Sequence, residues 1–316
     1  MAEKNNMEQE VEFCVTKDQE GKRFDVVLTE VLPEYTRSYL QKLCKEQRAR
    51  VGQKYVKGNY RCKEGDRVHL MIPEPKELEA KPEDMDLDIV YEDEDVILIN
   101  KPKGMVVHPA AGHDTGTLVN GLLAHCKGDL SGINGVLRPG IVHRIDKDTT
   151  GILIACKNDM AHQKIAAQLY EHSITRKYHA IVCGILKDDE GTIDAPIGRS
   201  PKDRKKMAVV PGGRRAVTHY KVLRRLKGYT YIECRLETGR THQIRVHMAS
   251  IGHPLLGDEV YGPKKQKFAL EGQCLHAKVL GFVHPRTSEY MEFETALPRY
   301  FTELLEKLDH SLGGKR

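Results

Sequence analysis

The stretch Gly140-Ile141-Val142-His143-Arg144-Ile145-Asp146-Lys147-Asp148-Thr149-Thr150-Gly151 joins a charged loop to strand material that follows directly. Arg138-Pro139-Gly140 before it is a turn signal, and Gly151-Ile152-Leu153-Ile154-Ala155 at its end is an uninterrupted apolar run that predicts a buried strand. Because the acidic residues come just before this strand, the sequence predicts that they lie at the mouth of a sheet.

Asp146 is the expected centre of this loop. The neighbouring His143, Arg144 and Lys147 would keep its carboxyl group ionised, since nearby positive charge favours the charged form. An ionised carboxylate suits a nucleophile better than a general acid. The alternative is a solvated turn in which the Asp and Thr side chains only satisfy nearby backbone groups. The rest of the chain has to decide between these interpretations.

The composition predicts a folded protein of two domains, because the chain has 316 residues and 40% of them are hydrophobic. No run of about 18 apolar residues exists and the first ten residues are polar and acidic, so we expect a cytoplasmic protein without a membrane span or signal peptide. The eight cysteines are scattered without a Cys-x-x-Cys pair and are expected to be reduced structural thiols. The net charge of +5 does not by itself identify a nucleic-acid-binding protein.

The distribution of charge is more informative. Residues 36–73 hold ten lysine or arginine residues and only three acidic ones. Apolar residues recur at helical spacing between Tyr39 and Cys44, and Arg37 and Lys42 belong to the positive side of this predicted helix. We expect a phosphate-binding face, because backbone phosphates supply most of the non-specific affinity for nucleic acids. The alternative is a charged surface helix on an ordinary domain.

The charge balance inverts in the next segment, where residues 74–95 hold eleven acidic residues against Lys76 and Lys81. The proline-containing part, 74–84, predicts an extended linker, and a second domain begins near Met85.

Many strands and few helices are predicted in this second domain. The expected strands are 95–100, 105–109, 151–155, 178–183 and 229–238, and the expected helices are 159–172 and 241–250. The segment 199–227, with eleven basic residues and one acidic residue, is expected to be a flexible basic loop. Because the strand–helix–strand alternation of a doubly wound fold is not sustained, we predict an α+β fold with a mixed, mainly antiparallel β-sheet.

Several motifs of other chemistries are absent. The sequence has no phosphate-binding Gly-x-x-x-x-Gly-Lys-Ser/Thr loop, no Gly-x-Gly-x-x-Gly fingerprint after a strand and no Gly-x-Ser-x-Gly elbow. His242 and His247 lack the intervening Glu of a zinc-binding His-Glu-x-x-His helix. We therefore expect no nucleotide hydrolysis, no dinucleotide redox chemistry, no serine hydrolysis and no bound metal.

Three motifs occur in a characteristic order: the loop 143–151, Arg176-Lys177-Tyr178, and the stretch from Leu236 through Arg240, His242 and Arg245 to Met248. Together they resemble the RluA family of pseudouridine synthases. Lys101-Pro102-Lys103-Gly104-Met105 and Gly252-His253-Pro254-Leu255-Leu256-Gly257-Asp258 extend the resemblance to roughly residues 85–300. The basic amino-terminal segment is similar to the alpha-L (S4-type) RNA-binding domain, a pairing typical of the RluD-like branch. Ile145 and Thr150 stand where the family more often has Leu and Ser.

The resemblance implies an isomerase that detaches uracil from ribose, turns it and rejoins it through carbon 5 without a cofactor. It assigns Asp146 as the catalytic carboxylate, Arg245 as the partner that keeps it charged, and Tyr178 as the residue against the extruded uracil. The residues expected to contact RNA are Arg144, His143, Arg240, His242, Arg37 and Lys42.

The resemblance also divides the chain into an alpha-L domain (11–73), an acidic linker (74–84) and a catalytic domain (85–310). We expect a monomer acting on structured RNA, most simply large-subunit ribosomal RNA. The alternatives are a transfer-RNA-directed synthase of the same family and a non-catalytic ribosome-assembly factor. A glycosidase using Asp146 and Asp148 is a weaker interpretation, because two acids so close in one loop rarely face each other across a scissile bond.

Overall fold

The computed structural model describes residues 9–33, 35, 37–72, 80–109, 113–127, 129–132, 139–265, 267–268 and 270–310. The chain forms two compact units, Met1–Glu77 and Leu78–Arg316, and each has a hydrophobic core of its own. The domain limits 11–73, 74–84 and 85–310 stay predictions, and residues 73–79 lie outside the described residues. In the described ranges, no helix is long and apolar enough to cross a bilayer.

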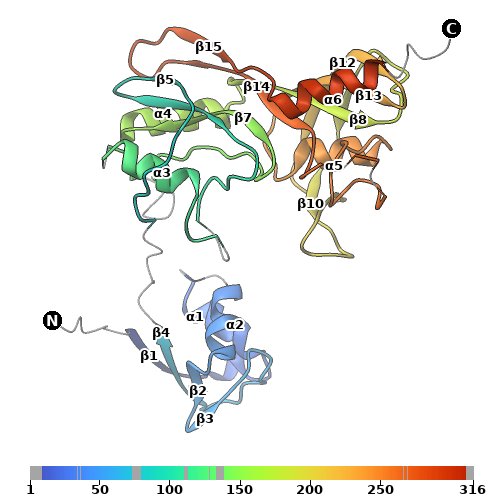
Figure 1. Ribbon diagram of the computed structural model, residues 1–316. Coiled ribbons are helices and arrows are strands. Elements are labelled where there is room, and N and C mark those ends of the chain that lie inside the picture. Colours follow the sequence, from blue (N-terminus) through green and yellow to red (C-terminus); the bar gives the residue numbers. More distant parts are fainter. Residues whose placement is uncertain are drawn as a thin grey trace. The chain divides into compact units, whose positions relative to one another are not determined.

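The amino-terminal unit combines two helices with a four-stranded antiparallel sheet in the order β1-β4-β2-β3 (Figure 1). Its elements are β1 (Gln9–Cys14), η1 (Lys17–Gln19), α1 (Phe24–Val31), α2 (Arg37–Lys45), β2 (Ala49–Val51), β3 (Lys54–Tyr55) and β4 (Arg67–Ile72). Phe24 and Leu28 of α1 and Leu40 of α2 are fully buried in one core with Leu70 of β4. The helix expected in this basic segment is confirmed as α2.

A buried carboxylate joins the two helices of this unit. Asp25 is fully buried and accepts hydrogen bonds from Arg23 Nε at 3.0 Å, from Arg37 Nε at 3.1 Å and from Gln41. Burial alone would raise the pKa of the Asp25 carboxyl, but these donors outweigh it and hold the pKa well below its usual range. The Arg37 guanidinium, expected to contact RNA, is therefore engaged within the unit, and the Lys42 side chain lies outside what the structure describes.

The second unit is built on one sheet in the order β5-β6-β7-β14-β8-β13-β12-β9, with β15 paired to β14. The pairing of β7 with β14 is parallel and the other pairs of this sheet are antiparallel, which confirms the predicted fold class. Its strands are β5 (Ile89–Glu92), β6 (Val96–Lys101), β7 (Thr150–Cys156), β8 (Thr175–Cys183), β9 (Glu190–Asp194), β12 (Val217–Leu226), β13 (Tyr229–Leu236), β14 (Leu275–Val283) and β15 (Tyr290–Glu294). A separate hairpin pairs β10 (Ile197–Arg199) with β11 (Met207–Val209).

Helices cover both faces of this sheet. They are α3 (Leu118–His125), α4 (Asp159–Tyr170), α5 (Gln243–Ser250) and α6 (Arg299–His310). Successive β8 side chains point to opposite faces: Ala180 and Val182 join the core that contains Met248 of α5, whereas Ile181 joins the core that contains Phe301 of α6. Figure 1 shows α3 and α4 beside one half of the sheet, and α5 and α6 beside the other.

Two of the expected elements are wrong. Residues 105–109 form no strand: the Met105 carbonyl accepts from the buried Lys101 ammonium, and the backbone carbonyls of 106 and 107 accept the N–H groups of Leu118 and Val119 at the start of α3. The segment 199–227 is not mainly a flexible loop, since it contains β11 and the ten-residue strand β12. On β12 the basic side chains Lys221 and Arg224 are exposed while Val217 and Leu226 at its two ends are buried, so these charges belong to a paired strand and not to a flexible loop.

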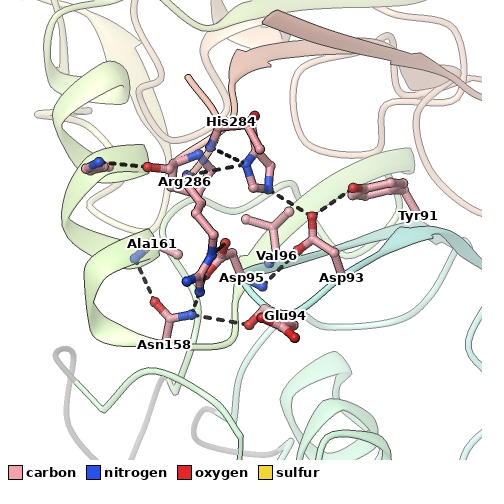
Figure 2. Close-up of polar contacts among 12 residues, drawn as sticks. Tyr91, Asp93, Glu94, Asp95, Val96, Asn158, Ala161, His284 and Arg286 are labelled. Atoms are coloured by element: carbon pink, nitrogen blue, oxygen red, sulfur yellow. Dashed lines mark hydrogen bonds and ion pairs between the residues drawn. The ribbon is translucent and has the colours of Figure 1, made fainter. Parts of the chain in front are cut away.

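A polar network joins the turn before β6 to the amino-terminal end of α4 and the turn after β14 (Figure 2). Asp93 Oδ1 accepts two backbone N–H groups at 2.8 Å, and its Oδ2 lies 2.8 Å from His284 Nε2. Asp95 accepts hydrogen bonds from Arg286 at 2.7 and 2.6 Å and from Asn158 at 2.8 Å. Asp93, Asp95 and His284 lie close enough to hold a cation. Because both carboxylates already accept several hydrogen bonds, the cluster acts as a structural junction.

Gly151 provides a test of the β7–β14 pairing. Its φ is +108°, and an added Cβ would lie 2.2 Å from the carbonyl oxygen of Ala277 on β14. We expect Gly151→Ala to lower the free energy of unfolding by about 3 kcal/mol or more, because backbone strain and a collision add. Gly228→Ala is the matched control: its φ is +77° with no atom within 4 Å, so about 1 kcal/mol is expected. Urea unfolding measures both, and equal losses would contradict the argument.

Candidate active site

Asp146 and Arg245 meet in the structure although 99 residues separate them. Asp146 lies in the loop before β7, and Arg245 is a buried residue of α5 whose Nη1 donates to Asp146 Oδ2 at 2.9 Å. The other side of the guanidinium donates to both oxygens of Asp258, from Nε at 2.7 Å and from Nη2 at 2.9 Å. The structure thus brings together the two residues that the sequence paired. Their catalytic roles stay predictions.

Asp258 fixes the charge and the orientation of Arg245. Burial raises the pKa of the Asp258 carboxyl, but the bonds from Arg245 and from the backbone N–H groups of Tyr261 and Val260 lower it further than burial raises it. Burial likewise lowers the pKa of the Arg245 guanidinium, and Asp258 together with Asp146 raises it well above its usual range. Both groups are therefore charged in the folded protein. Asp258 was missed as a site residue, although it ends one of the stretches that extend the family resemblance.

A buried lysine holds the backbone of the Asp146 loop. Lys101 is fully buried at the end of β6, and its Nζ donates to the carbonyl oxygens of Lys147 at 2.8 Å, Pro102 at 2.8 Å and Met105 at 2.9 Å. Burial lowers the pKa of Lys101 to about 7. Three acceptors favour the protonated form, because only an ammonium has three N–H donors. Sequence reasoning gave no role to Lys101, whose contact with Lys147 spans 46 residues.

His143 does not supply the positive charge that was expected beside Asp146. Its Nε2 accepts the backbone N–H of Ile154 at 3.1 Å, which requires an unprotonated nitrogen. Burial, helped by the positive charge of Arg176, lowers the pKa of His143 to about 3. The imidazole is therefore neutral and helps attach the loop to β7. Arg144 and Lys147, the other expected neighbours, are exposed.

A cavity of about 640 Å³ opens in front of Asp146. Its lining contains all the site residues predicted in the second unit: Asp146, Arg245, Tyr178, Arg144, His143, Arg240 and His242. Tyr178, on β8, is only 8% exposed. Its hydroxyl group has no hydrogen bond to another described residue, and burial raises the pKa of that hydroxyl. Arg176 and Arg214 also line the cavity, so its wall is strongly positive. Asp148 is not among the lining residues.

His242 connects the Asp146 carboxylate to Tyr261, which in turn contacts Met207. It precedes α5 in the left-handed region, with φ of +57°, a strained conformation for a residue other than glycine. Its Nε2 lies 3.8 Å from Asp146 Oδ1, and its Nδ1 lies 2.8 Å from the Tyr261 hydroxyl. That hydroxyl accepts the backbone N–H of Met207 in β11 at 3.0 Å. The hydroxyl hydrogen can then be donated to Nδ1, which leaves the His242 Nε2 proton facing Asp146.

Comparisons with known proteins agree with this architecture. Residues 95–250 match the family model for RNA pseudouridylate synthase, and residues 22–68 match the S4 domain. The chain is 54% identical to "Uncharacterized RNA pseudouridine synthase YlyB" of Bacillus subtilis, over 95% of this chain and 98% of that protein. It is 47% identical to "Ribosomal large subunit pseudouridine synthase D" of Zymomonas mobilis, over 94% and 97%. A solved structure, "Human RNA Pseudouridylate Synthase Domain Containing 4", has a TM-score of 0.53 at 28% identity and covers 70% of this chain and 92% of that one.

A mixed-sheet domain with a positive cavity, accompanied by an S4 domain, defines an RNA-modifying enzyme. The chain belongs to the RNA pseudouridine synthases, which isomerise uridine in RNA to pseudouridine. Several relatives of 44–47% identity carry the name of the large-subunit synthase D, which confirms the predicted RluD-like branch. The enzyme class and the RNA partner are confirmed with it.

Replacing Asp258 tests whether it stabilises Arg245. Asp258→Asn removes a fully buried charge, so we expect the free energy of unfolding at pH 7 to fall by about 3 kcal/mol. The pKa of Asp258 is lowered in the folded state. Its contribution is therefore complete above the unfolded value near 3.8 and is lost as the pH falls through the folded pKa. Urea unfolding between pH 7 and pH 3 measures this.

The matched control is Asp86→Asn, which changes an exposed carboxylate and should alter stability by less than about 0.5 kcal/mol. A gap between the wild-type protein and Asp258→Asn that widens with falling pH would contradict the proposed ion pair.

Proposed function

We propose that this enzyme isomerises uridines of large-subunit ribosomal RNA, with Asp146 as the catalytic carboxylate. The observation that carries the proposal is the chain Asp146–Arg245–Asp258, which aims one carboxylate into a cavity with a positive wall. The choice of RNA is supported by relatives named as large-subunit synthases, whose sequences align with nearly the whole chain. That the active species is a monomer stays a prediction.

The ion pair suits Asp146 to act on ribose. Arg245 occupies Oδ2 and leaves Oδ1 on the side of the carboxylate that lies 3.8 Å from His242. The C1′–N1 bond of the uridine breaks after Asp146 attacks the sugar or abstracts a sugar proton. The detached uracil stays in the cavity, turns against Tyr178 and forms the C1′–C5 bond. This step breaks the Asp146–sugar bond in the first route, and in the second route the abstracted proton returns to the sugar. The hydrogen on carbon 5 passes to water, and N1 takes up a proton. Both routes use the carboxylate form of Asp146, and Arg245 Nη1 lies 2.9 Å from Oδ2, where it can pair with that form.

The arginines of the cavity wall are suited to hold the RNA strand. Arg144 is exposed, and Arg240 lies deeper, its Nε donating to the carbonyl oxygen of Arg215 at 2.9 Å. Guanidinium groups attract phosphates and orient them, so these residues would keep the strand in place while a base is extruded at a cost of a few kcal/mol. A transfer-RNA-directed synthase would use the same arrangement. Mapping of modified uridines in both RNA classes, with and without the gene, separates the two.

Asp146→Asn tests the catalytic assignment. We expect the release of tritium from carbon 5 of labelled uridine in ribosomal RNA to fall by at least about three orders of magnitude, because the reacting carboxylate is lost. Binding of the same RNA on filters should stay within about twofold, since the change keeps the size of the side chain. Asp148→Asn is the matched control in the same loop and should retain most of the activity. Full activity of Asp146→Asn would refute the assignment.

The amino-terminal unit is expected to add electrostatic contacts. Lys54, Lys57 and Lys63 are exposed, so replacing all three by Gln should weaken RNA binding and lower the slope of log affinity against log salt by about 1 to 2. Arg37→Gln is predicted to act differently, by destabilising the unit, because buried Asp25 loses one of its partners. Filter binding at several salt concentrations, with thermal unfolding, distinguishes the two effects. An unchanged slope for the triple variant would exclude these lysines as phosphate contacts.

A further inference from the structure

Tyr170 is the last residue of α4, and its side chain is 86% exposed. Single exposed apolar residues are common and have no meaning by themselves. Tyr170 is different because it lines the same cavity as Asp146. Among the described residues its hydroxyl has no hydrogen-bond partner and its ring has no aromatic partner, so the whole ring is available to a ligand. No part of the reaction outlined above uses it.

The cavity has a buried part and an exposed part. Tyr178 and Arg245 are 8% and 6% exposed, and with Asp146 they form the inner part, where a target uridine would react. Tyr170 and Arg144 are both exposed and border the same space. RNA that delivers a uridine to Asp146 has to pass this outer part. The nucleotides beside the target are therefore the ligands that Tyr170 would meet.

The local charge around Tyr170 selects a base rather than a phosphate. The carbonyl end of a helix carries partial negative charge, and Tyr170 is followed by the exposed Glu171, which caps α4. Both features repel a phosphate. Arginine side chains elsewhere on the lining, Arg144, Arg214 and Arg240, attract it. A phenol ring at a negative helix end, near arginines that hold the backbone, is suited to stack on the neutral face of a nucleobase.

We propose that Tyr170 is a stacking platform for an unpaired nucleobase adjacent to the target uridine, so that the enzyme holds two neighbouring bases: one inside, against Tyr178, and one at the rim, on Tyr170. This inference rests on the proposed function. It implies that the substrate is unpaired around the modified position, because a base within a duplex has no free face to offer.

The test uses full-length protein and an unmodified transcript of large-subunit ribosomal RNA. Base–aromatic stacking is worth about 1–3 kcal/mol, so Tyr170→Ala should weaken binding by about 5- to 150-fold. Tyr170→Phe should stay within about twofold of wild type, and Tyr170→Leu should resemble Tyr170→Ala. In tritium release, the loss for Tyr170→Ala should appear in KM, with kcat nearly unchanged. Thermal unfolding should not change in any of the three, because the side chain is exposed.

Salt dependence separates stacking from a phosphate contact. Tyr170→Ala should leave the slope of log affinity against log salt unchanged, whereas Arg144→Gln should lower it by about 1. Wild-type affinity in Tyr170→Ala, equal losses in Tyr170→Phe and Tyr170→Ala, or a lowered salt slope in Tyr170→Ala would each overturn the proposal. If wild-type protein releases no tritium, the proposed function fails, while the binding ratios of the Tyr170 variants still decide whether the stacking contact exists.

Discussion

The ion pair between Arg245 and the fully buried Asp258 is the interaction on which the site depends. A guanidinium buried in a sheet–helix interface is costly unless its charge is compensated. Asp258 compensates it in a fork-to-fork geometry that uses Nε and Nη2, and this geometry directs Nη1 toward Asp146. The position of the Asp146 carboxylate is thus set by a second carboxylate that does not line the cavity. A bidentate pair fixes direction as well as charge, which a single contact with a flexible lysine would not do.

Three contacts hold the backbone of the loop that carries Asp146. Before β7, the Lys101 ammonium binds the Lys147 carbonyl and so fixes the backbone next to the carboxylate. Within β7, Gly151 permits a backbone approach to Ala277 that any side chain would block. His143 adds a third attachment through the N–H of Ile154. A charged loop that would otherwise be a solvated turn becomes a rigid support, and rigidity is what a reaction on one ribose atom requires.

Sequence reasoning predicted the parts of this site that local pattern encodes. The alternation along β13 and the apolar run of β7 fixed which faces are buried, and the family resemblance placed Asp146, Tyr178 and Arg245 together. Sequence reasoning missed the properties of residues whose partners lie far away in the chain. The neutrality of His143 follows from burial beside Arg176, the engagement of Arg37 from Asp25, and the role of Lys101 from a loop 46 residues away. The same limit explains the error at 199–227, because residue charge alone does not reveal that Val217 and Leu226 are buried in the sheet.

The arginines of the cavity explain why RNA binding and catalysis belong together. Arg176 is buried, and burial lowers the pKa of its guanidinium. It donates to a backbone carbonyl at 3.0 Å, and within the described residues no carboxylate pairs with it. Arg240 is likewise without a carboxylate partner in that part of the chain, and its guanidinium pKa is lowered by burial and by nearby arginines. Desolvated positive charges that lack counter-ions are unfavourable in the free protein and become favourable when a phosphate approaches. The arginines of the cavity wall therefore favour an anionic ligand, and the Asp146 carboxylate in the same lining is paired with Arg245.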